Sequence, residues 1–203
     1  MNTARYIVGV VLLISLPPGL LLWFAIHPFI RFWCKLGAGW TYTVLSPFVV
    51  VLMAILFLLR DELLGIDLGT HYVLLVPTAL CLVVGTVIAV IRRRHLRYSV
   101  LVGMPELSKS NKGTLLTDGI YGSIRHPRYV EVLFWSLAYA LFANYLGGYV
   151  AVGLCIPALY LIVVLEEREL RGRFGAEYAA YCRRVPRFIP RCRTPSNLRG
   201  GAI

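Results

Sequence analysis

The sequence predicts an all-α integral membrane protein with five transmembrane helices, the last two forming a helical hairpin, and an amphipathic C-terminal helix on the cytoplasmic side. Three observations support this prediction. Hydrophobic residues make up 58% of the 203 residues, whereas soluble domains are about 45–50% apolar. The mean hydropathy is +0.71. Long apolar segments alternate with arginine-rich ones, so the bilayer is the expected solvent, and the length fits one domain over residues 1–203.

The N-terminal part, residues 1–91, is expected to form three membrane helices. A membrane helix needs about 20 apolar residues. Such runs occupy residues 6–30, 40–59 and 71–91. We expect Pro17 and Pro18 to kink the first helix, and His27 with Pro28 to end it. A cleavable signal peptide is the alternative for the first run, but no clear cleavage site follows it.

Residues 92–203 are expected to hold a polar loop, the hairpin and a tail. The uncharged run 132–165 has 34 residues, which is too long for one ordinary span. The letters "NYLGG" at 144–148 are typical of a turn. Each arm then has about 16 residues, or roughly 24 Å as helix, so the run forms two short crossings.

The charge distribution predicts the orientation. The net charge is +11, and the arginines gather in the loop after the third helix and in the tail. The loop after the second helix instead carries Asp61, Glu62 and Asp67. Cytoplasmic loops are enriched in Lys and Arg. We therefore expect an outside N-terminus and a cytoplasmic C-terminus, in a bacterial inner membrane or the endoplasmic reticulum, with membrane lipids rather than nucleic acid as the partner of the basic segments.

The tail carries one apolar stripe at helical spacing, with charged residues on its other faces. Its members are Leu170, Phe174, Tyr178, Tyr181 and Val185. This pattern predicts a helix lying on the cytoplasmic surface. The five cysteines form no CxxC pair and the four histidines show no HExxH spacing, so we expect free thiols and no metal site.

The segment "YGSIRHPRYVE", residues 121–131, places cations and aromatic rings directly before the hairpin. Pro127 suits the first turn of a helix, whose backbone N–H groups favour an anion. Tyr121 and Tyr129 suit a cation or an adenine. The alternative is a membrane-edge anchor without a ligand.

Three carboxylates, Glu166, Glu167 and Glu169, follow the hairpin. They are costly at a membrane edge unless they are paired. Because the hairpin starts and ends on one side, they should meet Arg125 and His126. Such a cluster is either a ligand site or a structural Arg–Glu network that locks the hairpin to the tail.

Residues 117–131, "TDGIYGSIRHPRYVE", with the hairpin and "EERELRGRFGAEYAAYCRRVPRFIP", resemble the isoprenylcysteine carboxyl methyltransferase family and its phospholipid-methyltransferase relatives. The resemblance covers about residues 99–190. It implies S-adenosyl-L-methionine as cofactor, bound in a cytoplasmic pocket that the polar loop and the C-terminal helix close. Carried over by position, the cofactor-binding residues are Glu106, Gly113, Thr114, Leu115, Leu116, Tyr121, His126, Pro127, Arg128, Tyr129, Glu166 and Glu167.

The resemblance implies methyl transfer to a lipophilic or lipidated acceptor entering from the bilayer, with O-methylation of a carboxylate as the expected reaction. Arg125, His126 and Glu166 are the expected catalytic residues. Glu166 is assigned to the ammonium group of the cofactor. The first turn of the hairpin, with Arg125 or Arg128, is assigned to the carboxylate of the cofactor. Tyr121 and Tyr129 are expected to pack against its adenosyl or sulfonium part.

Two positions depart from the family pattern. Glu131 replaces a glycine, and its carboxylate is expected to narrow or repolarise the pocket. Ile162 replaces an arginine that, in the eukaryotic prenyl-cysteine enzymes, is thought to hold the substrate carboxylate. The second departure argues against prenylated protein C-termini as acceptors, but not against methyl transfer.

Three alternative functions remain open. One is an NADPH-dependent reductase of the sterol-reductase kind, which carries a similar motif with Asn where this chain has Arg128. The others are a phospholipid or amine N-methyltransferase and a non-catalytic lipid-binding membrane subunit. A methyltransferase should be stabilised by S-adenosylmethionine and not by NADPH. This response distinguishes it from the reductase and from the non-catalytic subunit.

Overall fold

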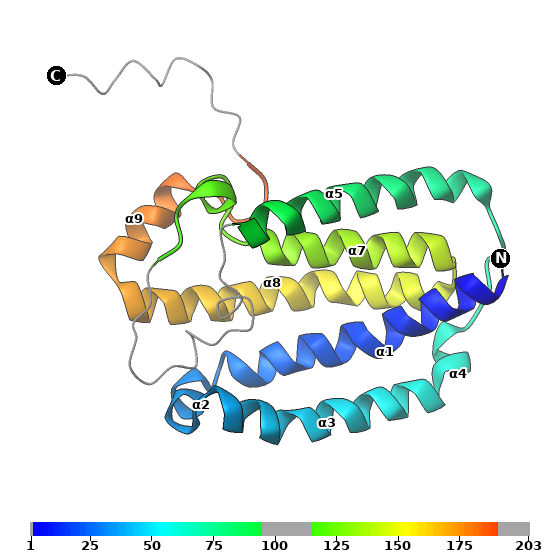
Figure 1. The fold of residues 1–203 in the computed structure, drawn as a ribbon, viewed down its shortest axis with the longest axis horizontal. Coiled ribbons are helices and arrows are strands. Elements are labelled where there is room, and N and C mark those ends of the chain that lie inside the picture. Colours follow the sequence, from blue (N-terminus) through cyan, green and yellow to red (C-terminus); the bar gives the residue numbers. More distant parts are fainter. Residues whose placement is uncertain (1, 95–114, 191–203) are drawn as a thin grey trace, which may run out of the picture.

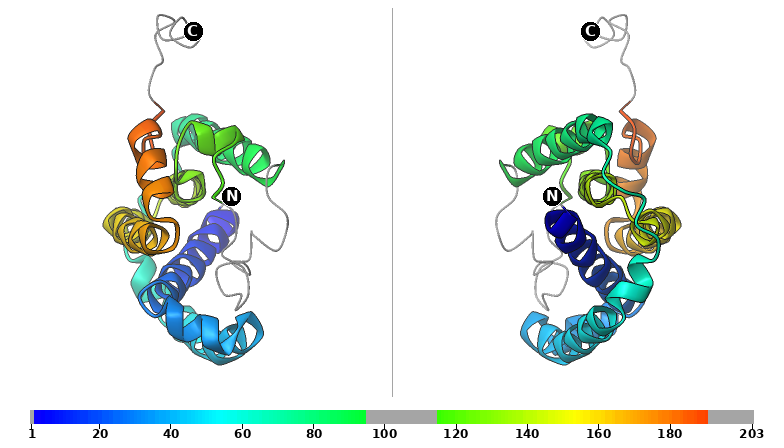
Figure 2. Two further views of the ribbon diagram at one scale, coloured as in Figure 1. Left: turned by 90° about the vertical axis from the view of Figure 1, so that its left-hand side faces the viewer. Right: turned by 90° about the vertical axis from the view of Figure 1, so that its right-hand side faces the viewer.

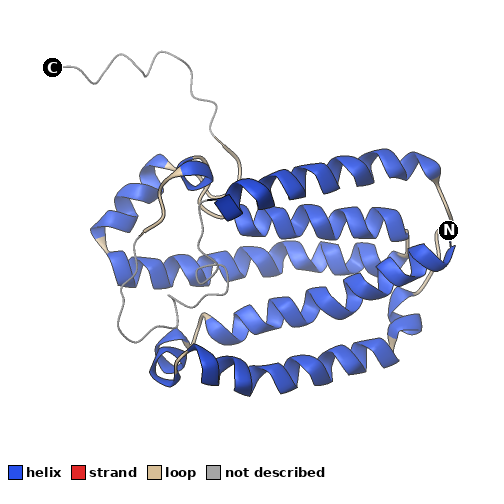
Figure 3. Ribbon diagram, in the orientation of Figure 1, coloured by secondary structure: helices blue, strands red, loops and turns tan. Residues whose placement is uncertain are grey.

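The computed structural model of the protein describes residues 2–94 and 115–190, and these are helical apart from short connections (Figure 3). The helices and 3₁₀ segments are α1 (Asn2–Ile26), α2 (Ile30–Leu36), α3 (Ala38–Leu58), α4 (Arg60–Leu64), η1 (Tyr72–Leu74), α5 (Leu75–Arg94), η2 (Gly119–Gly122), α7 (Pro127–Ala143), α8 (Leu146–Phe174) and α9 (Ala176–Arg184). The all-α prediction is confirmed for this part of the chain.

The long helices lie side by side (Figure 1). Seen from the ends of the bundle, α1 and α7 are central, and α8 packs against both of them (Figure 2). Each outer helix packs against one central helix: α5 packs against α7, and α3 packs against α1. This order places α1 and α7 at the centre of the bundle (Figure 2).

Small side chains on α7 allow this close packing. Ala138, Ala140 and Ala143 are fully buried, and a Cβ added to Gly148 of α8 would lie 3.7 Å from Ala140. Helices in lipid have no water to drive them together, so they associate through tight packing of small residues. Larger apolar residues of α1 and α8, such as Leu12 and Val163, fill the core beside them.

The turn between α7 and α8 is tighter than "NYLGG" suggested. It consists of Asn144, in the left-handed conformation with φ 54°, and Tyr145. The two glycines lie inside α8 instead. Arg5 of α1 closes this end of the bundle by donating from Nε to the carbonyl of Ala143 at 3.0 Å, and it also pairs with Asp67.

Four helical segments among the described residues are long and apolar enough to cross a membrane. They are α1, α3, η1 with α5 (Tyr72–Arg94) and α8. With 17 residues, α7 is shorter than these four. Large apolar side chains such as Trp40 and Phe48 on α3 and Val76 on α5 are exposed, as lipid-facing residues should be.

Two predictions about the C-terminal half are corrected. The fifth predicted helix was expected to end at Leu165, but α8 continues to Phe174, so the three glutamates lie on it. The predicted tail helix is interrupted at Gly175, where φ is +56°, a conformation that favours glycine. Its apolar stripe therefore spans two helices, yet all five stripe residues still pack in one cluster with Leu115.

Candidate functional site

The polar residues singled out in the sequence meet at one end of the bundle. The ends of α1, α5 and α8, the start of α7, and α9 all lie at this end, on the left in Figure 1. The hairpin brings this about because α7 runs away from this end and α8 returns to it. The expected convergence of the Arg–His segment with the glutamates is confirmed by direct ion pairs.

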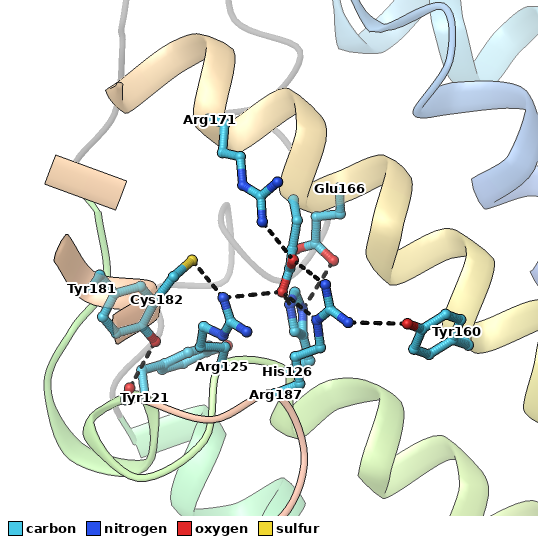
Figure 4. Close-up of polar contacts among 10 residues, drawn as sticks. Tyr121, Arg125, His126, Tyr160, Glu166, Arg171, Tyr181, Cys182 and Arg187 are labelled. Atoms are coloured by element: carbon cyan, nitrogen blue, oxygen red, sulfur yellow. Dashed lines mark hydrogen bonds and ion pairs between the residues drawn. The ribbon is translucent and has the colours of Figure 1, made fainter. Parts of the chain in front are cut away.

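Glu167 lies at the centre of the cluster and is 1% exposed. Its Oε1 is 3.2 Å from Nη1 of Arg125, and Arg187 donates to both of its oxygens, at 3.0 and 2.8 Å. Arg171, one helical turn further on, adds a contact of 3.5 Å. Figure 4 shows these arginines converging on the carboxylates of α8. Glu167 is thus neutralised from several directions.

His126 lies between two carboxylates and is 3% exposed. Its Nδ1 is 3.4 Å from Glu166 and its Nε2 is 3.3 Å from Glu167. Burial lowers the pKa of His126, but hydrogen bonds and charges of Glu166 and Glu167 outweigh burial and hold this pKa above its ordinary value. A ring that faces a carboxylate at each nitrogen carries both protons, so His126 is an imidazolium.

Glu166 has fewer partners than its neighbour. Its side chain is 21% exposed, and its ion pair with His126 is the one salt bridge that it forms among the described residues. The side chain of Tyr129 also interacts with it. Its buried Oε2 accepts no well-formed hydrogen bond from the part of the chain that the structure describes. This oxygen therefore has capacity left for a cation or another donor.

The segment after α9 is held against the Arg–His segment through its backbone. The amides of Arg125 and His126 donate to the carbonyls of Pro186 and Arg187, at 2.9 and 3.1 Å. From α9, Tyr181 donates from its hydroxyl to the carbonyl of Tyr121 at 2.7 Å. The C-terminal segment is thus fixed beside the start of α7.

Sequence reasoning missed Arg187 and Cys182, which contact the cluster directly. Cys182 of α9 accepts a hydrogen bond from Arg125. The signal for Arg187 was present, because three glutamates need cations and the tail is rich in arginine. The choice among those arginines depends on the break at Gly175, which the pattern of apolar residues did not reveal.

The C-terminal end of α1 also contributes to the site, although no motif marked it. His27 is buried, and its Nδ1 is 3.4 Å from Oε2 of Glu169. The ring of Trp23 stacks on His27, with centroids 5.3 Å apart. Trp23 also meets Arg128, whose Cζ lies 4.3 Å from the ring centroid. All three glutamates are therefore paired, as predicted.

The remaining predicted site residues are placed as follows. Pro127 is the first residue of α7, and the ring centroid of Tyr129 is 5.8 Å from that of His126. Tyr121 lies on the α9 side of Arg125 (Figure 4), and Leu115 packs against α9. Leu116 is partly buried. Glu106, Gly113 and Thr114 lie outside the described residues.

The two departures from the family pattern have structural explanations. Arg92 of α5 holds Glu131 through two buried contacts of 2.9 and 3.3 Å. This carboxylate therefore links α5 to α7, and the expectation that it repolarises the pocket is not supported. Ile162 is fully buried in the core between α1, α7 and α8. It leaves α8 without a cation one turn before the paired glutamates.

Comparison with known proteins finds similarity to protein-S-isoprenylcysteine O-methyltransferases. The chain is 39% identical over 88 residues to the protein-S-isoprenylcysteine O-methyltransferase of Schizosaccharomyces pombe, a match that covers 41% of this chain and 36% of that protein. It is 36% identical over 84 residues to the human protein of the same name, covering 40% and 29%.

A third relative carries a different name. The cobalt-zinc-cadmium resistance protein CzcN of Cupriavidus metallidurans is 35% identical over 85 residues, covering 42% of this chain and 39% of that protein. The matches thus span well under half of the length of each of these relatives. No family model matches the chain. No solved structure is significantly similar to it.

Proposed function

We propose that this protein transfers a methyl group from S-adenosylmethionine to the carboxylate of a lipophilic acceptor in the membrane. The observation that supports this function best is the partly buried, incompletely satisfied carboxylate of Glu166 beside the imidazolium of His126. The names of the relatives favour an isoprenylated acceptor. None of the relatives described above is named a reductase, so the NADPH alternative has no support from them.

The residues at the site fit this cofactor. Oε2 of Glu166 accepts no well-formed hydrogen bond from the described residues, so it can accept one from an ammonium group. The first turn of α7, which begins at Pro127, has backbone N–H groups without helical partners, and these suit a carboxylate. Arg125 is already paired with Glu167, so its role is to position Glu167 and the tail. Tyr129 and Tyr121 border the cofactor, whereas Arg128 lies against Trp23 of α1 and is not needed to hold the cofactor.

The protein needs to align two reactants and exclude water. The cofactor supplies an activated methyl group on a sulfonium, and the attacking carboxylate has no proton to lose. Holding two reactants in line lowers the barrier by about 7–11 kcal/mol. His126 keeps Glu166 oriented, and Arg187 keeps the tail closed over the start of α7. Neither residue needs to transfer a proton during the reaction.

We further propose that α7 crosses the membrane as a fifth, short span. Its N-terminal end lies with the arginine-rich ends of α5 and α8, which the positive-inside rule assigns to the cytoplasm. The cofactor then enters from the cytoplasm, and the acceptor enters sideways from the lipid. The N-terminus lies outside under this topology.

Ligand-dependent stability tests this function. The thermal unfolding midpoint of the purified protein in detergent should rise with S-adenosylmethionine or S-adenosylhomocysteine, by a stabilisation of about 2.7 kcal/mol at 100 times the dissociation constant. NADPH should leave it unchanged. Methyl-labelled cofactor, incubated with membranes, then identifies the acceptor. A shift with NADPH and none with the other two ligands would reject the proposal.

A further inference from the structure

The guanidinium of Arg128 differs from the other arginines of the site. Arg125, Arg171 and Arg187 are all paired with Glu167. Arg128 forms no salt bridge with any carboxylate in residues 2–94 and 115–190. Its charge instead lies over the ring of Trp23, 4.3 Å from the centroid. A guanidinium stacked on an indole is held in place by its face, while its N–H donors at the edge stay available.

Apolar side chains continue from this guanidinium into the bundle. Val132 lies one turn after Arg128 on α7, and Leu20 and Phe24 flank Trp23 on α1. All of these are only partly buried, and they pack against the core cluster. Helices α1 and α7 pack against each other, and these residues lie against the same core cluster between them. A molecule with an anionic head and an apolar body matches this arrangement.

We infer that Arg128, held on Trp23, binds the carboxylate of the acceptor and thereby selects lipophilic carboxylates with an apolar chain lying along α1 and α7. This inference depends on the proposed methyl transfer for its chemistry. Arginine binds a carboxylate through two parallel hydrogen bonds, which leaves lone pairs on the oxygens for attack on the methyl group. The buried Ile162 provides no such group on α8, so α1 and α7 provide it here.

Binding of two matched probes tests the inference without requiring turnover. One probe is an S-farnesylated cysteine with a free carboxylate and a blocked amine, and the other is its primary amide. The dissociation constants of both are measured for the full-length protein in detergent, together with that of S-adenosylmethionine. The unchanged protein should prefer the carboxylate probe by about tenfold or more, which is the typical effect of a charge-assisted hydrogen bond.

Substitutions should then separate the two ligands. Arg128→Gln should abolish the preference for the carboxylate probe and change the affinity for S-adenosylmethionine by less than about twofold. Trp23→Leu removes the supporting ring and should reduce the preference for the carboxylate probe in part. This second variant keeps the inference testable if Arg128→Gln does not fold. Arg168→Gln, at an exposed position of α8, is the control and should preserve the preference.

Several results would overturn the inference. A preference retained in Arg128→Gln would show that another group holds the carboxylate. An equal loss of affinity for both probes in Arg128→Gln would show that Arg128 acts only in packing. A larger loss of affinity for S-adenosylmethionine than for the carboxylate probe would assign Arg128 to the cofactor. Failure of the unchanged protein to bind S-adenosylmethionine, with the probe preference intact, would reject methyl transfer but not the carboxylate site.

Discussion

Glu166 and Glu167 are neighbours on α8 and yet have different surroundings. Consecutive residues of a helix point about 100° apart, so the two carboxylates face different elements. Glu167 points towards Arg125 and the C-terminal Arg187, and it is fully buried. Glu166 keeps an exposed fraction of 21% and forms a single ion pair within the described ranges 2–94 and 115–190. We conclude that Glu167 holds the site together, whereas Glu166 is the group available to a ligand.

Glutamine substitutions distinguish these two roles. Glu167→Gln leaves the arginines around it without their counter-charge and should destabilise the protein by about 3 kcal/mol or more. Glu166→Gln should change stability by less than about 1 kcal/mol and abolish detectable stabilisation by S-adenosylmethionine. Chemical unfolding in detergent, with and without cofactor, measures both effects. Equal destabilisation by the two substitutions would contradict this division.

Alanine substitutions test the catalytic assignment. Glu166→Ala and His126→Ala should each abolish methyl transfer while the protein still inserts into the membrane. The measurement is incorporation of labelled methyl groups by membranes that contain equal amounts of each protein. Turnover retained in both variants would show that the assignment from the family pattern is misplaced.

His126 should make stability depend on pH. Its pKa is raised above the ordinary 6.5 by the two carboxylates, so folding favours the protonated ring. The stabilisation by His126 is therefore complete below about pH 6.5 and is lost as the pH rises through the folded-state pKa. The unfolding midpoints of the unchanged protein and of His126→Gln should converge as the pH rises above about 6.5. A difference that grows with pH would mean that the buried ring is neutral.

At the scale of helices, close backbone approach depends on a few small residues. A Cβ at Gly147 of α8 would lie 1.8 Å from the carbonyl oxygen of Leu63 in α4, so no other residue fits without moving a helix. At Gly153 on the same helix, nothing lies within 4 Å of such an atom. The "NYLGG" glycines were read as turn residues, and the structure instead gives at least Gly147 a packing role.

These two glycines form a matched pair for a stability test. Gly147→Ala should destabilise the protein by about 1–3 kcal/mol through forced separation of α4 and α8. Gly153→Ala should not destabilise the protein and should stabilise it by up to about 1 kcal/mol, because alanine favours a helix and its methyl group faces open space. Unfolding in detergent measures both. A similar loss for the two would point to lipid contact, rather than to packing of α8 against α4, as the cause.

At the scale of the whole molecule, membrane topology decides whether α7 crosses. Reporter proteins joined after Asp67 and at the C-terminus should report an outside and a cytoplasmic location, respectively. Both follow from five crossings and the positive-inside rule. A C-terminus on the same side as the N-terminus would require an even number of crossings and would remove α7 from the count. The four long helices of the described chain would then be the only spans within it.

Local properties of the chain were sufficient to predict the solvent, the helical class and the side on which the polar residues gather. Hydrophobicity and charge are properties of each segment by itself. A hairpin starts and ends on the same side, so the charged residues at its two ends must lie on that side. These properties also predicted that His126 lies near Glu166 and Glu167, because the hairpin that connects them consists of two regular helices.

Packing between distant segments decided the rest. The contact of His27 with Glu169 joins residues 142 positions apart, and that of Arg92 with Glu131 joins two helices across an intervening loop. Which arginine meets which glutamate depends on helix rotation and on the break at Gly175, and neither is encoded in residue spacing. For the same reason the stacking of Arg128 on Trp23, the basis of the inferred acceptor site, became visible only when α1 and α7 were packed together.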